Sequence, residues 1–275
     1  MGQRFAAPVL MVVSGLSMYA GAAVAVGLFD VLPPSVVAWL RIAAAGLLLL
    51  VLRRPKIAEF FGRAGAVAAV FGVVTLGMNM AFYEAISELP LGTAVAIEFL
   101  GPIAVAAWGS RSVRDWLALV LAGGGVLVLS GAQWSASAYG VLFALLAAAL
   151  WALYIVVGAR VAKERSKNSL AVSFCWAGVL AIPLAVLAWP QHGVGMATWQ
   201  LLALAAGLGL LSAVIPYSLD QVILRITSPD YFAVLLALLP LTAALLGAVA
   251  LGQVLSVAEM VGIGAVVAAV ALRKQ

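Results

Sequence analysis

The sequence predicts an all-α polytopic membrane protein whose ten transmembrane helices form two inverted repeats of five. The composition is the first reason: 66% of the 275 residues are hydrophobic and 9% are charged, whereas soluble domains are nearly half apolar and about a quarter charged. The second reason is that the apolar sequence divides into ten segments of membrane length. The third is that basic residues gather in every second connection between these segments.

Each expected span meets the length requirement of the hydrocarbon core, which takes about 20 apolar residues in a helix. The expected spans are 6–28, 35–52, 64–86, 91–109, 113–131, 138–161, 168–189, 197–218, 230–251 and 255–272. The first begins after Arg4 as a signal peptide would, but it is longer than such a segment and nine spans follow, so we expect it to remain. Because the connections are short, we expect no soluble catalytic or nucleotide-binding domain.

Basic residues give the spans an orientation. Of the 15 Lys and Arg residues, all but Arg41 lie at the two ends or in the connections around 53–63, 111–114, 160–167 and 225. Cytoplasmic loops of membrane proteins carry this excess of positive charge, so we expect these four connections and both termini in the cytoplasm. The charges are dispersed over short loops, so we expect no nucleic-acid partner.

Proline positions indicate an internal repeat of the halves 1–135 and 136–275. In each half one proline opens the fourth span and another interrupts it 12 or 11 residues later: Pro90 and Pro102, then Pro229 and Pro240. Five spans per half place the second half upside down relative to the first. Inverted repeats with interrupted helices around a midplane site are typical of alternating-access transporters. The alternative is that each proline is only a packing kink.

Arg41 and Glu98 are the only charged residues near the middle of expected spans. Each costs about 2.5–3.5 kcal/mol to insert unless it is paired or hydrated. Counted from the external face at about 1.5 Å per residue, Arg41 lies ~10 Å deep and Glu98 ~12 Å deep. We therefore expect them either to form a salt bridge or to line one hydrated cavity, where they could meet the carboxylate and ammonium of a zwitterion. A purely structural ion pair is the alternative.

Further polar and aromatic residues are candidates for the wall of such a cavity. Asn79 and Tyr83 recur four residues apart on the third span, although small polar residues also pack membrane helices together. Mid-span aromatic residues with a hydrogen-bonding group require a partner or a wet surface; the sequence places Trp151, Tyr154 and Trp176 in this class.

Acidic residues at the edges of spans are expected to be interfacial and solvated. Asp220 follows the expected end of span eight. Ionisable residues near membrane spans mark proton relays, so Asp220 is, with Glu98, a candidate for proton coupling.

Two segments resemble a known family. Residues 90–104 read PLGTAVAIEFLGPIA and residues 215–226 read IPYSLDQVILRI. These are similar to segments of the threonine/homoserine exporter branch of the drug/metabolite transporter superfamily, the ten-helix EamA-type proteins, over essentially the whole chain. The resemblance implies a basket of ten helices in the bacterial inner membrane and export of small amino acids from the cytoplasm.

The resemblance also implies roles for individual residues. Glu98 and Pro102 match the family's Glu and Pro of span four, and Tyr217 with the acidic residue three positions later matches the end of its span eight. The chain departs from the family at Leu239 and Gln253, where Glu is common. A mechanism that needs an acidic residue in the second repeat is therefore in doubt, which gives Glu98 more weight. A related branch exports aromatic amino acids, so we expect threonine, homoserine, methionine and aromatic amino acids as candidate substrates.

Other classes of function find less support in the sequence. An intramembrane enzyme, for example one acting on a lipid, would need a catalytic set, and the chain has no HExxH, no GxSxG and no His within an expected span. Exporters of other metabolites or drugs, a channel and a non-transporting scaffold stay open. We expect no enzyme activity, no metal or cofactor and no protein partner; the expected partners are a small-molecule substrate and the bilayer.

Overall fold

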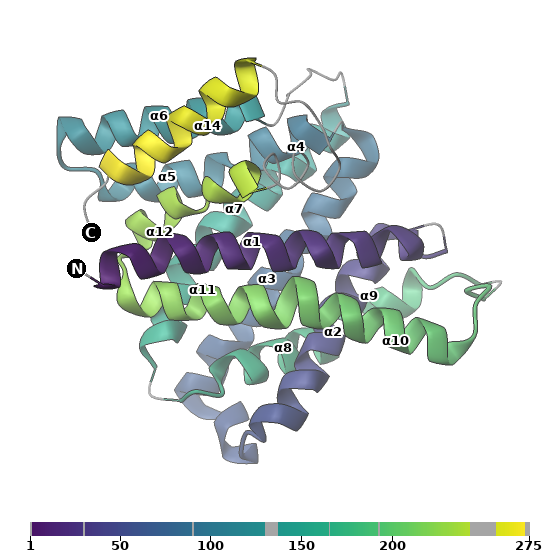
Figure 1. Ribbon diagram of the computed structural model, residues 1–275. Coiled ribbons are helices and arrows are strands. Elements are labelled where there is room, and N and C mark those ends of the chain that lie inside the picture. Colours follow the sequence, from purple (N-terminus) through teal and green to yellow (C-terminus); the bar gives the residue numbers. More distant parts are fainter. Residues whose placement is uncertain are drawn as a thin grey trace.

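The computed structural model describes residues 2–29, 31–89, 91–129, 137–164, 166–191, 193–242 and 257–272. All regular elements in these ranges are helices (Figure 1). Pro90, Gln253 and the basic residues of the C-terminal end lie outside the described residues, as does much of expected span nine.

Helices begin and end close to the expected spans. They are α1 (Gly2–Phe29), α2 (Pro34–Arg53), α3 (Gly62–Glu88), α4 (Leu91–Glu98), α5 (Leu100–Gly109), α6 (Val113–Leu129), α7 (Ala138–Lys163), α8 (Ser169–Leu180), α9 (Ile182–Leu187), α10 (Thr198–Gly209), α11 (Ile215–Ile226), α12 (Pro229–Leu235) and α14 (Val257–Leu272). A 3-10 turn, η1 (Ile57–Phe60), lies between α2 and α3, and a π turn, η2 (Leu210–Val214), joins α10 to α11.

Four helices of the described part are long and apolar enough to cross a membrane: α2, α3, α7 and the continuous helix Thr198–Ile226. Apolar stretches of 10–17 residues lie within α1, across α4 and α5, in α8, from α12 to Thr242 and in α14. One boundary differs from expectation, because the helix expected to end at 218 continues to Ile226. The polar residues of this last stretch lower its hydropathy, but the backbone stays helical.

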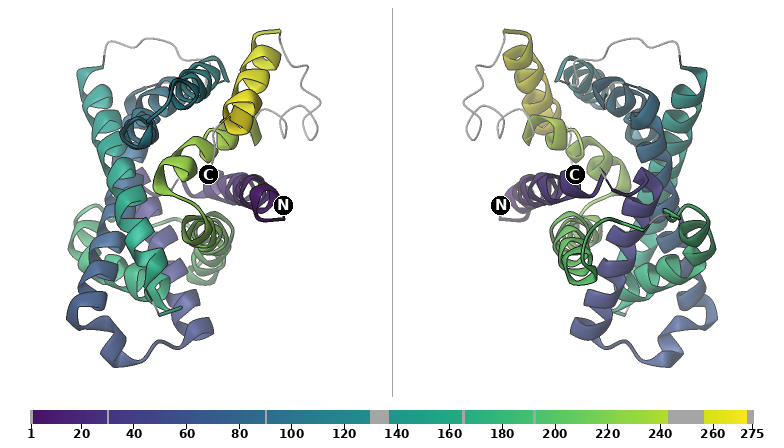
Figure 2. Two further views of the ribbon diagram at one scale, coloured as in Figure 1. Left: turned by 90° about the vertical axis from the view of Figure 1, so that its left-hand side faces the viewer. Right: turned by 90° about the vertical axis from the view of Figure 1, so that its right-hand side faces the viewer.

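The helices are arranged around α3, which packs against α7 and α8, while α2 packs against α3, α8 and α10. The helix α1 runs beside α10 and α11, and α6 pairs with α14 (Figure 1). Figure 2 shows α1 and α11 together on one side of the molecule and α7 on the other. Small residues allow close approach: a Cβ on Gly72 would collide with the Ser173 carbonyl of α8, and one on Gly101 with the Ala148 carbonyl of α7.

Both interrupting prolines coincide with a helix break. Phe99 separates α4 from α5, three residues before Pro102. The helix α12 ends at Leu235, and two turn residues precede the helical residues 238–242 that contain Pro240. Proline has no N–H, so the carbonyls four residues earlier, those of Glu98 and Leu236, lose their α-helical donor.

A third proline, Pro216, explains the π turn and a contact with α1. The Ile215 N–H bonds to the Leu210 carbonyl instead of the Leu211 carbonyl. Pro216 has no N–H to offer, so the Leu211 carbonyl has no donor within the helix. The Ser17 hydroxyl of α1 supplies it, with Oγ 2.6 Å from the Leu211 oxygen. A serine on α1 thus compensates for a proline 199 positions away in the sequence, since 216 − 17 = 199.

Hydrogen bonds join the basic connections to one another. In η1, Glu59 accepts from the Ser166 hydroxyl and the Asn168 amide of the α7–α8 connection. These bonds, led by that from Ser166, lower the pKa of Glu59, which lies outside the spans. Arg225 at the end of α11 donates Nε–H to the Ala162 carbonyl at 2.8 Å. We call the region of residues 53–63, 160–167 and 225 the basic end.

Candidate functional site

Arg41 holds three helices together in the interior. It lies on α2 with 7% of its surface exposed. Its Nη1 donates to the Tyr83 hydroxyl of α3 at 3.2 Å, and its Nη2 donates to Asn79 Oδ1 of α3 at 2.6 Å and to the Tyr217 hydroxyl of α11 at 3.1 Å. The Nε atom is buried, and no acceptor for it is found in the described residues. A guanidinium has five N–H donors, so this network leaves Arg41 with donors to spare.

Asn79 and Tyr217 complete the network around the cation. The Asn79 amide donates to the Thr75 carbonyl at 2.6 Å and to the Tyr217 hydroxyl at 2.9 Å. The Tyr217 oxygen therefore accepts two hydrogen bonds, one from Asn79 and one from Arg41, and no acceptor for its own proton is found in the described residues. The network presents donors that lack a partner.

Tyr154 and Asp220 form a second polar pair beside this network. The Tyr154 hydroxyl of α7 donates to Asp220 Oδ2 of α11 at 2.7 Å, and Ser14 of α1 lies near the same carboxylate. The Tyr154 ring stacks on Phe71 with centroids 5.1 Å apart and meets the edge of Tyr217 at 5.6 Å.

Asp220 corrects one expectation from the sequence. We expected it to be interfacial and solvated, but it is 7% exposed. The physical reason is that α11 continues past the expected end of the span, so α7 and α1 pack over Asp220.

Glu98 lies at the break between α4 and α5 and is 9% exposed. No hydrogen-bond donor to its carboxylate is found in the described residues, and it forms no salt bridge with Arg41. The charge of Arg41 is nevertheless close enough to act on Glu98. The expected salt bridge is thus absent because the donors of Arg41 go to the Tyr and Asn groups of α3 and α11.

The remaining expected residues divide between this region and others. Pro102 is buried on α5 directly after the break, and Trp151 of α7 meets the edge of the Phe99 ring at 5.9 Å. Trp176 lies apart: its Nε1 donates to the Phe60 carbonyl of η1 at 3.1 Å, at the basic end. Pro240 is half-buried at the break that follows α12.

Phe71 and Phe174 were not expected in the region. Phe71 stacks on Tyr154, and Phe174 of α8 meets the edge of Tyr217 at 5.4 Å. The sequence does not distinguish these two phenylalanines from others, because Phe is common in membrane spans.

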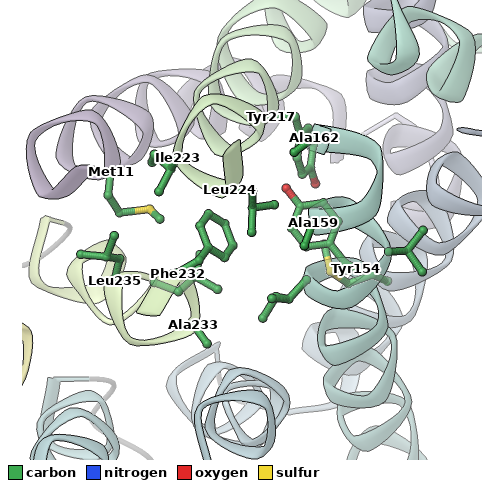
Figure 3. Close-up of a cluster of buried hydrophobic side chains, with 14 of the residues drawn as sticks. Met11, Tyr154, Ala159, Ala162, Tyr217, Ile223, Leu224, Phe232, Ala233 and Leu235 are labelled. Atoms are coloured by element: carbon green, nitrogen blue, oxygen red, sulfur yellow. The ribbon is translucent and has the colours of Figure 1, made fainter. Parts of the chain in front are cut away.

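Apolar side chains cover the network on both sides. Towards α12, Figure 3 shows Leu224 and Phe232 beside the two tyrosines, Tyr154 and Tyr217. Around Tyr83, a second cluster includes Leu28, Leu32, Val36, Val37 and Leu208. The network is therefore enclosed in this structure, and a solute can reach it only if helices move.

Comparison with known proteins identifies the class of molecule. The chain is 33% identical over 264 residues to the threonine/homoserine exporter RhtA of Escherichia coli (strain K12), over 95% of this chain and 88% of RhtA. It is 32% identical over 266 residues to RhtA of Salmonella typhimurium (strain LT2), over 95% and 89%. The profile of the EamA-like transporter family matches residues 138–273. The chain belongs to the EamA-like transporter family. This confirms the resemblance noted in the sequence.

More distant comparisons agree with this membership. An uncharacterized inner membrane transporter of Escherichia coli (strain K12), YedA, is 27% identical over 251 residues, which are 87% of this chain and 81% of YedA. A solved crystal structure that is 20% identical has a TM-score of 0.78 and covers 98% of this chain and 97% of its own. At that identity the likeness shows the fold. The EamA-like transporter therefore shares its fold with a chain of nearly the same length.

Proposed function

We propose that this EamA-like transporter is a secondary exporter of small neutral amino acids, working by alternating access in the bacterial inner membrane. Threonine and homoserine are the first candidate substrates, because the RhtA exporters carry these names and cover 95% of the chain. Methionine and the aromatic amino acids follow as candidates. One observation carries the proposal: Arg41 is a buried cation with spare donors, its charge acts on the buried Glu98, and no donor to the Glu98 carboxylate is found in the described residues.

The two groups match the two ends of an amino acid. The carboxylate of the substrate would take donors from Arg41 and the Tyr217 hydroxyl, and its ammonium would bind Glu98. A planar guanidinium binds a carboxylate through parallel hydrogen bonds. A buried charge without a partner costs several kcal/mol, and the opposite charge of the substrate offsets that cost. Pro102 also leaves the backbone carbonyl of Glu98 without its helical donor, which gives the ammonium a second acceptor.

Alternating access would use the two interrupted helices. The proposed repeats are residues 1–135 and 136–275, and each has its break beside an interrupting proline, Pro102 or Pro240. The helix α5 packs against α12, so the breaks belong to neighbouring elements. Discontinuous helices of this kind surround the midplane sites of inverted-repeat transporters.

We propose that the basic end faces the cytoplasm together with both termini. The bonds between η1 and the α7–α8 connection, and between Arg225 and Ala162, support a shared face for the basic connections. Arg114 donates to the Leu272 carbonyl at the end of α14. This bond supports placing the connection around residues 111–114 on the same side of the membrane as the C-terminus. Positive charge in cytoplasmic loops gives the direction.

Glu98 and Asp220 are the proposed carriers of a coupling proton. Both are buried carboxyl groups on helices that bear the site, and a carboxyl that gains or loses a proton there changes the net charge of the site. The bond from the Tyr154 hydroxyl connects Asp220 to the aromatic pair beside Arg41. Under this proposal, Asp220→Asn removes the dependence of export on the proton gradient while threonine still exchanges across the membrane.

The function is tested by uptake of a labelled panel into proteoliposomes, led by threonine, homoserine, methionine and phenylalanine. Wild type is compared with Glu98→Gln and with Glu164→Gln, which removes an exposed carboxylate at the end of α7. We expect saturable uptake in wild type and Glu164→Gln and its loss in Glu98→Gln. Uptake no greater than in empty liposomes for every amino acid would contradict the substrate class and favour another metabolite or drug.

A further inference from the structure

A pocket at the basic end, separate from the Arg41 network, opens to the surface. It has a volume of about 150 Å³, and liquid water takes about 30 Å³ per molecule, so it has room for a small solute. Its polar lining includes three cations, Arg53 at the end of α2, Lys167 before α8 and Arg225 at the end of α11. None of its lining residues is acidic.

The three cations are exposed residues that line one pocket, and none of its described lining residues carries a negative charge. Arg225 is fixed by the bond from Nε to the Ala162 carbonyl, which leaves its terminal nitrogens for another acceptor. Lys167 adjoins Ser166 and Asn168, whose side chains are bound to Glu59, so its backbone is anchored. Like charges held close together repel one another, and an anion between them removes that repulsion.

Gln221 also contributes to the lining. Its Nε2 is buried beside Gly158 of α7 and finds no acceptor among the described residues. A buried donor without a partner costs about 1–3 kcal/mol. Ser218 adds a hydroxyl to the lining, one helical turn before Val222. The cavity therefore combines three positive charges with neutral groups able to donate hydrogen bonds, a set that fits an oxygen-bearing anion.

We propose that this cavity binds a small oxyanion, a carboxylate or a phosphate. The occupant is either a free solute anion or the phosphate of an anionic lipid headgroup, since basic pockets at the cytoplasmic ends of membrane helices suit both. The site lies close to the Arg41 network along the chain: Gln221 follows Tyr217 by one helical turn, and Leu49 of the lining follows Arg41 by about two. An anion bound here would therefore lie between the basic end and the Arg41 network, on the side proposed to face the cytoplasm. The binding claim itself does not depend on what the protein transports.

The first arm of the test follows the thermal unfolding midpoint of the purified full chain in an uncharged detergent. Inorganic phosphate or acetate replaces chloride at constant ionic strength. The double variant Arg53→Gln/Lys167→Gln is compared with Arg63→Gln/Arg160→Gln, which removes two exposed cations that do not line the cavity. We expect a concentration-dependent rise that reaches about 5 °C in wild type at a hundred times the dissociation constant. The rise is lost in the first double variant and kept in the second.

The second arm distinguishes the sources of the anion. The same proteins are placed in nanodiscs of phosphatidylcholine, with and without phosphatidylglycerol. Stabilisation by phosphatidylglycerol alone, lost in Arg53→Gln/Lys167→Gln, assigns the cavity to a lipid headgroup; stabilisation by free phosphate or acetate assigns it to a solute. Lys167→Arg keeps the positive charge, so we expect this variant to retain binding. It tests the need for charge at position 167 even where the double variant fails to fold. Equal responses of the two double variants, or no response to any anion, would overturn the proposal.

Discussion

The Tyr217 hydroxyl is the most informative single group in the Arg41 network, and Tyr217→Phe removes it with the least disturbance. Its oxygen accepts from Arg41 Nη2 at 3.1 Å and from the Asn79 amide at 2.9 Å. The ring is kept, together with its edge contacts to Tyr154 and Phe174. The substitution therefore leaves two buried donors without an acceptor and changes little else.

The expected loss of stability follows from these two bonds. Hydrogen bonds between membrane helices average about 0.6 kcal/mol with a maximum near 1.7, while bonds to charged groups contribute about 1.5–3 kcal/mol in general. One charged and one neutral donor together give about 2 kcal/mol, which lowers the unfolding midpoint by roughly 4–8 °C for a chain of this size. Because Arg41 also loses its tie to α11, we expect weaker binding of the substrate carboxylate.

The assay compares the thermal unfolding and the threonine half-saturation concentration of wild type, Tyr217→Phe and Tyr139→Phe. Tyr139 is 51% exposed and provides the matched control. We expect a lower midpoint and a half-saturation concentration raised about tenfold for Tyr217→Phe, equal to about 1.4 kcal/mol, and no change for Tyr139→Phe. If Tyr217→Phe matches the control in both measurements, the hydroxyl does not hold Arg41 in place and the reasoning is refuted.

Three further predictions test the fold around the site. Ser17→Ala leaves the Leu211 carbonyl unpaired, so the unfolding midpoint of this variant should fall by roughly 2–4 °C. Ser87 is exposed, and the midpoint of Ser87→Ala should stay unchanged. Equal midpoints of the two variants would contradict the role given to Ser17. Gly101→Ala forces its Cβ against the Ala148 carbonyl, so it should lower the yield of folded protein and the free energy of unfolding, the latter by about 1–3 kcal/mol. Gly124→Ala has open space around it and should be neutral or stabilising. The same effect of both variants on the unfolding midpoint would show that α5 and α7 do not approach this closely. The pKa of Glu59 is lowered in the folded protein, so its stabilising effect is present above the ordinary value of 4.5 and is lost as pH falls through the lower folded value. The midpoint of wild type should therefore exceed that of Glu59→Gln at pH 7, and the two should converge as pH falls below 4.5; a difference independent of pH would contradict this.

Helix positions and helix breaks were predictable from the sequence because both depend on local chemistry. An apolar run of sufficient length forms a helix in a bilayer regardless of its neighbours. Proline removes a backbone donor wherever it occurs, and the breaks before Pro102 and Pro240 agree with that loss. The lost donor is not sufficient by itself, because α1 continues through Pro8 without a break.

Partners across helices were less predictable. Equal depth along their helices suggested that Arg41 and Glu98 interact, and the charge of Arg41 does act on Glu98. Depth could not show that the tyrosines and Asn79 take up the donors of Arg41. Asp220 was expected in water because hydropathy falls where it occurs, although packing by α1 and α7 decides its burial. Trp176 was grouped with the cavity by its depth, yet its side chain faces η1. Such choices depend on helix rotation, which a single sequence does not specify.

The most direct test of the proposed site asks whether it requires both charges of an amino acid. Labelled threonine uptake into proteoliposomes is measured against three competitors: unlabelled threonine, threonine amide, which lacks the carboxylate, and N-acetylthreonine, which lacks the ammonium. If Arg41 and Glu98 bind the two ends of the substrate, only unlabelled threonine competes effectively, and each analogue needs at least about a hundredfold higher concentration, the equivalent of one lost charged interaction of roughly 3 kcal/mol. Competition by either analogue as strong as that of threonine itself would contradict a zwitterion site built from these two residues.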